Sequence, residues 1–72
     1  MSNTRNESII KDFGQRLSVA RKQKGITQLE LGEKVGVSQI QIARIETGKV
    51  NTTISTVYCI ASALGVKASE II

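Results

Sequence analysis

Glycine residues divide this chain into short segments, and this punctuation constrains the fold more than any other feature of the sequence. Four of the six glycines, Gly25, Gly36, Gly48 and Gly65, directly follow segments in which apolar residues recur at helical spacing. Glycine is favoured just after a helix because the backbone there takes a left-handed conformation that other residues avoid. Features typical of strands are few, and the chain contains no proline. The glycines therefore predict an all-α chain made of short helices.

Capping signals mark where two of these helices begin. Thr27-Gln28-Leu29-Glu30 matches the S/T-x-x-E/Q capping box, in which two side chains satisfy backbone N–H groups of the first turn. Ser38-Gln39-Ile40-Gln41 matches the same pattern. Together with the glycines, these signals predict helices over 8–24, 27–35, 38–47 and 54–64, and a last short helical turn over 68–72. Residues 1–7 are polar and are expected to form a flexible arm, so that residues 8–72 make up a single domain.

Apolar residues form a stripe along each predicted helix. The stripes are Ile10, Phe13, Leu17 and Ala20 in the first helix, Leu31 and Val35 in the second, Ile42 and Ile45 in the third, and Ile54, Val57, Ala61 and Leu64 in the fourth, with Ile26 and Val37 in the connectors. These stripes can converge in one core. The sequence thus predicts a compact all-α domain of five short helices.

Two glycines fall inside predicted helices, where each costs about 1 kcal/mol relative to alanine. For Gly14 two interpretations are open, simple tolerance or close packing of another helix over the missing side chain. For Gly32 we expect close packing, because it precedes the short connector Gly36-Val37-Ser38. That connector is too short for antiparallel packing, so the helices on either side should cross steeply, as in a helix-turn-helix.

The composition limits the classes of partner. Hydrophobic residues make up 40% and charged residues 22% of the chain, as in an ordinary globular domain. The net charge of +4 favours a polyanionic partner, either nucleic acid or an acidic membrane surface. No apolar run approaches the roughly 20 residues that span a membrane. A single cysteine and the lack of an apolar N-terminal segment indicate a cytoplasmic protein.

The residues that catalysis usually requires are missing. The chain has no histidine, and Asp12 and the glutamates are scattered without a paired arrangement. No glycine-rich phosphate loop or cluster of metal ligands is present. Cys59 has no histidine to activate it, and we expect it to be a buried or half-buried structural thiol. The sequence therefore predicts a protein that is not an enzyme, with no cofactor, no metal and no evident small-molecule ligand.

The helix predicted over 38–47 carries isoleucine on two sides. Ile42 and Ile45 point roughly the same way, as core residues do, whereas Ile40 lies on the opposite side. The outward side consists of Ile40, Ala43, Arg44 and Thr47. A side exposed only to water would normally carry lysine and glutamate, so this side is expected to meet a partner.

Residues 25–49, GITQLELGEKVGVSQIQIARIETGK, resemble the helix-turn-helix of the Cro and phage-repressor (Xre-like) family of transcription regulators, and the resemblance extends through LGV at 64–66. The matching features are Thr27-Gln28, Leu31 with a small residue at 32, Gly36-Val37-Ser38, Ile42, Ile45-Glu46 and Gly48. Leu29, where the family usually has a polar residue, and Gly32, where alanine is commoner, depart from the pattern. The resemblance implies a compact five-helix, lambda-repressor-like DNA-binding domain with the helix-turn-helix at the second and third helices.

In this family the third helix lies in the major groove of DNA and its outward side meets the edges of bases. The resemblance therefore implies base contacts by Gln39, Ile40, Gln41, Ala43, Arg44 and Thr47. Arginine can pair with guanine, glutamine with adenine, and isoleucine can contact the methyl group of thymine. Contacts with DNA phosphates are implied for Gln28, Ser38, Lys49, Asn51 and Thr52. Three alternatives stay open here: Ile40 also fits an isolated exposed apolar residue, Ser38 also fits a helix cap, and Lys49 also fits a solvated loop lysine.

The resemblance also implies a structural ion pair between Arg21, late in the first helix, and Glu46, at the end of the third. The predicted function is that of a sequence-specific regulator of transcription, of repressor or controller type, that binds a palindromic operator in double-stranded DNA as a homodimer. The subunit contact is expected at the C-terminal end, from Leu64, Val66, Ile71 and Ile72, although Leu64 and Val66 can instead complete the core. The alternatives are an antitoxin that also binds its own operator, or a helical protein-interaction module.

Overall fold

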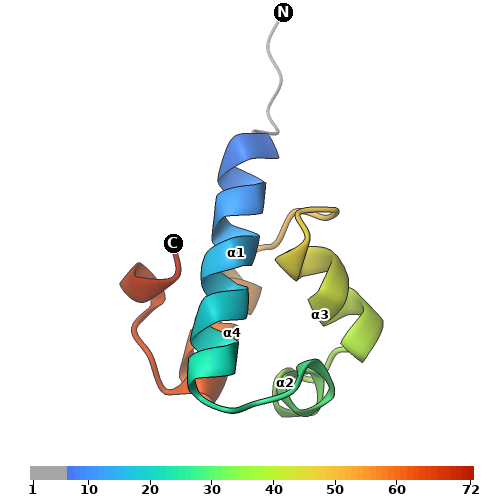
Figure 1. The fold of residues 1–72 in the computed structure, drawn as a ribbon, viewed down its shortest axis with the longest axis vertical. Coiled ribbons are helices and arrows are strands. Elements are labelled where there is room, and N and C mark those ends of the chain that lie inside the picture. Colours follow the sequence, from blue (N-terminus) through green and yellow to red (C-terminus); the bar gives the residue numbers. More distant parts are fainter. Residues whose placement is uncertain (1–6) are drawn as a thin grey trace, which may run out of the picture.

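The computed structural model describes residues 7–72, which form four α-helices and a short 3₁₀ turn. The α-helices are α1 (Glu7–Gln23), α2 (Gln28–Val35), α3 (Gln39–Glu46) and α4 (Ile54–Leu64), and the 3₁₀ turn is η1 (Ala68–Glu70). Figure 1 shows α3 beside α1, and α2 crossing below α3 close to the C-terminal end of α1. The all-α prediction is confirmed for this part of the chain.

The predicted α-helices are all present, and their ends lie within one residue of the predicted ends. The prediction of five helices is wrong, because the last segment of the described chain forms only a three-residue 3₁₀ turn. The N–H of Lys67 donates to Oε2 of Glu70 (2.7 Å), which closes this turn, and the next residue, Ile71, already points into the core. The flexible arm predicted over 1–7 lies outside the described residues, apart from Glu7, which begins α1.

The predicted caps begin α2 and α3. Oγ1 of Thr27 accepts from the N–H of Glu30 (3.0 Å), and Oε1 of Glu30 accepts from the N–H of Thr27 (2.8 Å), so this capping box is complete. Oγ of Ser38 accepts from the N–H of Gln41 (3.1 Å), which is the first half of the second box. The four glycines named above all have positive φ angles, between 69° and 89°. These local signals explain why the helix ends were predictable.

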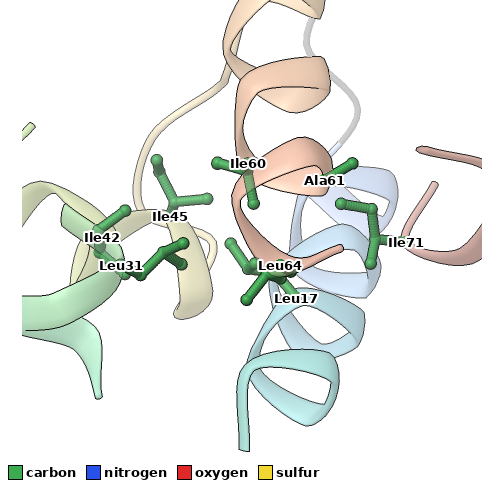
Figure 2. Close-up of a cluster of buried hydrophobic side chains, with 8 residues drawn as sticks. All are labelled: Leu17, Leu31, Ile42, Ile45, Ile60, Ala61, Leu64 and Ile71. Atoms are coloured by element: carbon green, nitrogen blue, oxygen red, sulfur yellow. The ribbon is translucent and has the colours of Figure 1, made fainter. Parts of the chain in front are cut away.

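The core is aliphatic and draws on every helix (Figure 2). Its buried members are Leu17, Leu31, Ile42, Ile45, Ile60, Ala61, Leu64 and Ile71. Ile71 is fully buried on the side of α1 and α4 away from α2 and α3, so the end of the chain folds back against the bundle. The stripe predicted for α4 needs one correction. Ile54 is 75% exposed at the rim of a groove that Ile9 and Phe13 of α1 also line, whereas Ile60 is fully buried.

Two glycines allow backbones to approach closely. A Cβ added at Gly14 would lie 2.5 Å from the carbonyl oxygen of Ile45 and 2.6 Å from that of Glu46. A Cβ added at Gly32 would lie 2.6 Å from the carbonyl oxygen of Val37. Gly14 therefore lets α1 pack directly on the end of α3, and Gly32 lets α2 pack against the connector that leads into α3. Close packing, one of the two interpretations of Gly14, is the correct one.

Replacing Gly14 by alanine should lower the free energy of unfolding by about 1–3 kcal/mol, the usual range for overpacking. The decrease is expected even though alanine is favoured over glycine inside a helix by about 1 kcal/mol, because the new methyl group would meet two backbone oxygens of α3. Denaturation by urea measures the change. Gln15→Ala, at an exposed position of the same helix, is the control and should have little effect. Equal or higher stability of Gly14→Ala would show that α1 and α3 have room to separate.

Candidate nucleic-acid interface

The connector Gly36-Val37-Ser38 joins α2 to α3 through a sharp turn. Gly36 has a φ of 89°, and the N–H groups of Gly36 and Val37 both donate to the carbonyl oxygen of Gly32 (2.8 and 2.9 Å). Leu31 of α2 and Ile42 of α3 are fully buried and lie side by side in the core (Figure 2). The two short helices are therefore held together as one helix-turn-helix unit.

One side of α3 faces the core and the other faces solvent. Ile42 and Ile45 are buried, whereas Ile40 is 66% exposed and Arg44 is also exposed. The α3 outward face, as we call it, is formed by Gln39, Ile40, Ala43, Arg44 and Thr47. Ala43 is half-buried and the other four side chains are exposed. The structure thus brings together five of the six residues predicted to contact bases.

The sixth residue, Gln41, lies on a flank of α3. It is half-buried and lines a hollow of about 160 Å³ together with Asn51, Thr53 and Thr56. A step of 100° per residue turns Gln41 away from Ile40 and toward the connection to α4. The structure does not bring Gln41 onto the α3 outward face.

Thr47 closes the C-terminal end of α3. Its hydroxyl donates to the carbonyl oxygens of Ala43 (2.9 Å) and Arg44 (3.3 Å). The hydroxyl proton is therefore already hydrogen-bonded within the helix. Only the lone pairs of the oxygen can accept a hydrogen bond from a donor on a base. The carbonyl oxygen of Arg44 also accepts from the N–H of Lys49 (2.9 Å), which turns the chain out of α3.

A buried ion pair fixes α3 against α1. Nε and Nη2 of Arg21 donate to the two carboxylate oxygens of Glu46 (2.6 and 3.0 Å), and both side chains are more than nine-tenths buried. Nη1 of Arg21 donates to the carbonyl oxygen of Ile26 (2.9 Å). Burial acts to raise the pKa of the Glu46 carboxyl, but hydrogen bonds from Arg21 and Gln28 and the charge of Arg21 outweigh burial, and the pKa lies below its ordinary value of 4.5. This is the structural ion pair that the sequence resemblance implied.

Gln28 belongs to the same network. Its Nε2 donates to Oε1 of Glu46 (3.0 Å), so the side chain joins the first residue of α2 to the last residue of α3. The sequence prediction gave Gln28 a phosphate contact and missed this structural role. The two residues are 18 positions apart in the chain, and no local pattern links them.

The loop between α3 and α4 holds three of the residues predicted to contact phosphates. Lys49 and Asn51 are exposed, and Oδ1 of Asn51 accepts from the N–H of Thr52 (2.9 Å). The prediction for Thr52 is not supported for its hydroxyl group, because Oγ1 of Thr52 is buried. The hydroxyl of Ser38 caps α3 and the residue is exposed.

The predicted subunit contact is also corrected. Ile71 is fully buried and Leu64 is 3% exposed, so both belong to the core of one subunit, and Val66 is half-buried. Of the four predicted residues only Ile72 is freely exposed, at 63%. The spacing of apolar residues could not distinguish these roles, because it does not show that the chain end folds back onto the core.

A different group of apolar side chains is exposed at one end of the bundle. Ile9, Ile54, Tyr58 and Ile72 are each at least 60% exposed and line a groove of about 280 Å³, whose floor includes Phe13 and Val57. We call these four side chains the apolar surface. The sequence carries one signal for it that sequence reasoning missed: from Val50 to Val66 there is no charged residue.

In the range 7–72 no group of three His, Cys, Asp or Glu side chains is placed to hold a metal ion. Cys59 is exposed, which corrects the expectation of a buried or half-buried thiol. None of the helices in this range is long and apolar enough to cross a membrane.

Replacing Glu46 by glutamine should lower the free energy of unfolding at neutral pH by about 3–5 kcal/mol, because it leaves the Arg21 guanidinium buried without a counter-charge. The pKa of Glu46 is lowered in the folded protein, so the contribution of the pair is fully present above pH 4.5 and is lost as the pH falls through the lower folded-state pKa. The difference between the two proteins should therefore shrink below pH 4.5. Urea denaturation over a pH series measures it.

The control for this prediction is the exposed ion pair of Asp12 and Arg16, whose side chains are 56% and 50% exposed and whose closest atoms lie 3.0 Å apart. Asp12→Asn should change stability by less than about 1 kcal/mol. A stability difference for Glu46→Gln that stays constant into the acid range would contradict the assignment of the pair as the source of the pH dependence.

A family model described as "Helix-turn-helix" (HTH_3) matches residues 17–71. The immunity repressor protein of Bacillus phage phi105 is 39% identical over 59 residues, which are 82% of this chain and 41% of the repressor. The uncharacterized HTH-type transcriptional regulator y4dJ of Sinorhizobium fredii is 37% identical over 82% of this chain and 77% of its own length. Antitoxin HipB of Escherichia coli is 38% identical over 67% of this chain and 54% of the antitoxin.

Solved structures show the same fold. The restriction-modification controller protein C.AhdI from Aeromonas hydrophila has a TM-score of 0.88 and 27% identity, and the match covers 92% of this chain and 96% of that protein. The P22 c2 repressor, in complex with a synthetic operator, has a TM-score of 0.76 and 27% identity over 83% of this chain and 91% of that chain.

Proposed function

This chain belongs to the helix-turn-helix family whose model matches residues 17–71, and from this premise we propose that it binds a palindromic operator as a homodimer, with α3 of each subunit in the major groove. The coarser function, that of a DNA-binding regulator of transcription, follows from the family and its relatives. The observation that carries the finer proposal is the α3 outward face, where an exposed isoleucine and arginine lie on a helix whose other side is fixed in the core.

The α3 outward face has the chemistry needed to read base edges. In this proposal Arg44 donates two hydrogen bonds to a guanine, Ile40 contacts a thymine methyl group, and Gln39 pairs with an adenine. The helix is short, so its orientation in the groove depends on its attachment to the rest of the protein. The Arg21–Glu46 pair and the close contact at Gly14 supply this attachment.

Contacts with the DNA backbone set the register of α3 in the groove and contribute affinity without sequence information. We assign this role to Lys49 and Asn51 in the exposed loop after α3, and to Ser38 at its start. Gln28 retains its predicted phosphate contact in this proposal through the second hydrogen of its amide nitrogen, since the first is bound to Glu46. The net charge of +4 favours approach to the phosphates from a distance.

Two copies are needed because one short helix reads only a few base pairs. A two-fold dimer places two copies of α3 in successive major grooves, about 34 Å apart, and so matches a palindromic operator. Two copies of a chain with a charge of +4 repel one another, and they can approach most closely through a face that carries no charge. Ile54 and Tyr58 of the apolar surface lie in the uncharged stretch 50–66, and we therefore propose that this surface receives the second copy.

Similarity to the antitoxin HipB supports a second candidate function. In this alternative the chain neutralises a toxin as well as binding its own operator, and the apolar surface receives the toxin. Expression of the neighbouring gene, alone and together with this chain, distinguishes the two. Growth inhibition that this chain relieves would support the antitoxin, whereas no inhibition by the neighbour alone would contradict it.

Replacing Arg44 by alanine should weaken binding to the cognate operator by about 1–3 kcal/mol while affecting random DNA less, because a base contact is lost and the phosphate contacts remain. The operator is first obtained by selection from a random pool of duplexes, and affinities are then measured at one salt concentration. Lys67→Ala, which also removes one exposed positive charge, is the control and should change both affinities little. Equal losses on operator and random DNA for Arg44→Ala would contradict a base-reading role.

Replacing Tyr58 by lysine should weaken the dimer by roughly tenfold or more, since an unpaired charge would be buried in the subunit contact. Sedimentation equilibrium over a concentration series measures the change. Val19→Lys adds the same charge at another exposed apolar side chain, outside the apolar surface, and should leave the equilibrium as it is. An unchanged monomer–dimer equilibrium in Tyr58→Lys would rule out this contact. Ile71 is unsuitable for the test, because a polar residue in the core would unfold the chain.

A further inference from the structure

Lys11 of α1 lies against Gly48, in the turn after α3. A Cβ added at Gly48 would lie 2.6 Å from Cγ of Lys11, 3.4 Å from its Cβ and 3.1 Å from its Cα. The stem of the Lys11 side chain therefore packs on the backbone of Gly48, although the two residues are far apart in the sequence. Gly48 lies between Thr47, the last residue of the α3 outward face, and Lys49.

From this contact we infer that Lys11 binds the same stretch of DNA backbone as the loop after α3, as a phosphate contact supplied by α1. The inference rests on the proposed function, because it requires α3 to lie in the major groove. A lysine that packs its apolar stem on a neighbouring backbone keeps its ammonium group in water, where a phosphate can reach it. Lys11 is exposed, so this end of its side chain is accessible.

Glu7 and Asp12 are the carboxylates that lie near Lys11 on α1, and neither forms an ion pair with it among the described residues. The acidic residue next to it, Asp12, is paired with Arg16 at 3.0 Å. The buried ion pair of Arg21 with Glu46 lies further along α1, toward its C-terminal end. In this inference a phosphate meets two lysines from different elements of the fold, Lys11 from α1 and Lys49 from the loop after α3.

A structural role for Lys11 has to be distinguished from this one. The C-terminal end of α3 carries partial negative charge, and a nearby cation stabilises such an end by about 0.3–1 kcal/mol. A merely structural lysine would change stability but not the number of counterions that the protein displaces from DNA. The salt dependence of DNA binding therefore separates the two roles.

The experiment compares the wild type with Lys11→Gln, Lys11→Arg and Lys67→Gln on both the selected operator and a random duplex. Glutamine keeps the Cβ and Cγ that pack on Gly48 and removes the charge. Lys11→Gln should reduce the slope of log affinity against log salt concentration by about one per subunit on both duplexes. Lys11→Arg should restore the wild-type slope. Lys67→Gln removes the same charge at an exposed position before η1 and should leave the slope unchanged.

The inference would be overturned if Lys11→Gln had the same slope of log affinity against log salt concentration as the wild type and Lys67→Gln. A loss of stability in Lys11→Gln with an unchanged slope would also overturn it. Failure of the wild type to select or bind any duplex would instead overturn the proposed function, and the role of Lys11 with it. The two failures are distinguished by the wild-type measurement, which precedes the comparison.

Discussion

The buried pair of Arg21 and Glu46 is the interaction on which the arrangement of this small domain depends. The guanidinium group of Arg21 donates to both carboxylate oxygens of Glu46 and to the carbonyl oxygen of Ile26, and Gln28 donates to the same carboxylate. These contacts join the end of α1, the start of α2 and the end of α3. Hydrophobic burial is not directional, whereas this fork of hydrogen bonds fits only one relative orientation of its partners. Polar contacts thus help to set the direction of α3 within an otherwise aliphatic core.

The same three elements also meet through backbone contacts that leave no room for side chains. Gly14 brings α1 onto the carbonyl groups that end α3, and Gly32 brings α2 onto the connector that begins it. α3 is thus held at both ends, by one glycine contact at each, with the ion pair at its C-terminal end. A helix of eight residues has little stability of its own. Its position is determined by these attachments rather than by its intrinsic helical preference.

Local signals in the sequence were enough to predict the helices but not every residue's surroundings. Thr27, Ser38 and the glycines act through neighbouring backbone groups, so their effect can be read from a few consecutive residues. Ile54 and Ile71 show where this fails: helical spacing tells which side of a segment is apolar, but not where the covering elements end or where the chain folds back. The role of Gln28 and the contact of Lys11 with Gly48 join residues distant in sequence, and no local pattern reveals them. The pairing of Arg21 with Glu46 was expected only because the chain resembles a family.

The two sides of α3 have separate tasks, and this separation has an evolutionary consequence. Ile42, Ile45 and Glu46 attach the helix to the domain, while Ile40 and Arg44 face solvent. Substitutions at the exposed positions remove no core contact and no member of the ion-pair network, so selection can vary them with little loss of stability. Under the proposed function, in which these exposed positions read bases, duplicated copies of the gene can therefore diverge in the DNA that they recognise while keeping one scaffold. New specificities would arise by changing a few surface residues, without passing through unfolded intermediates.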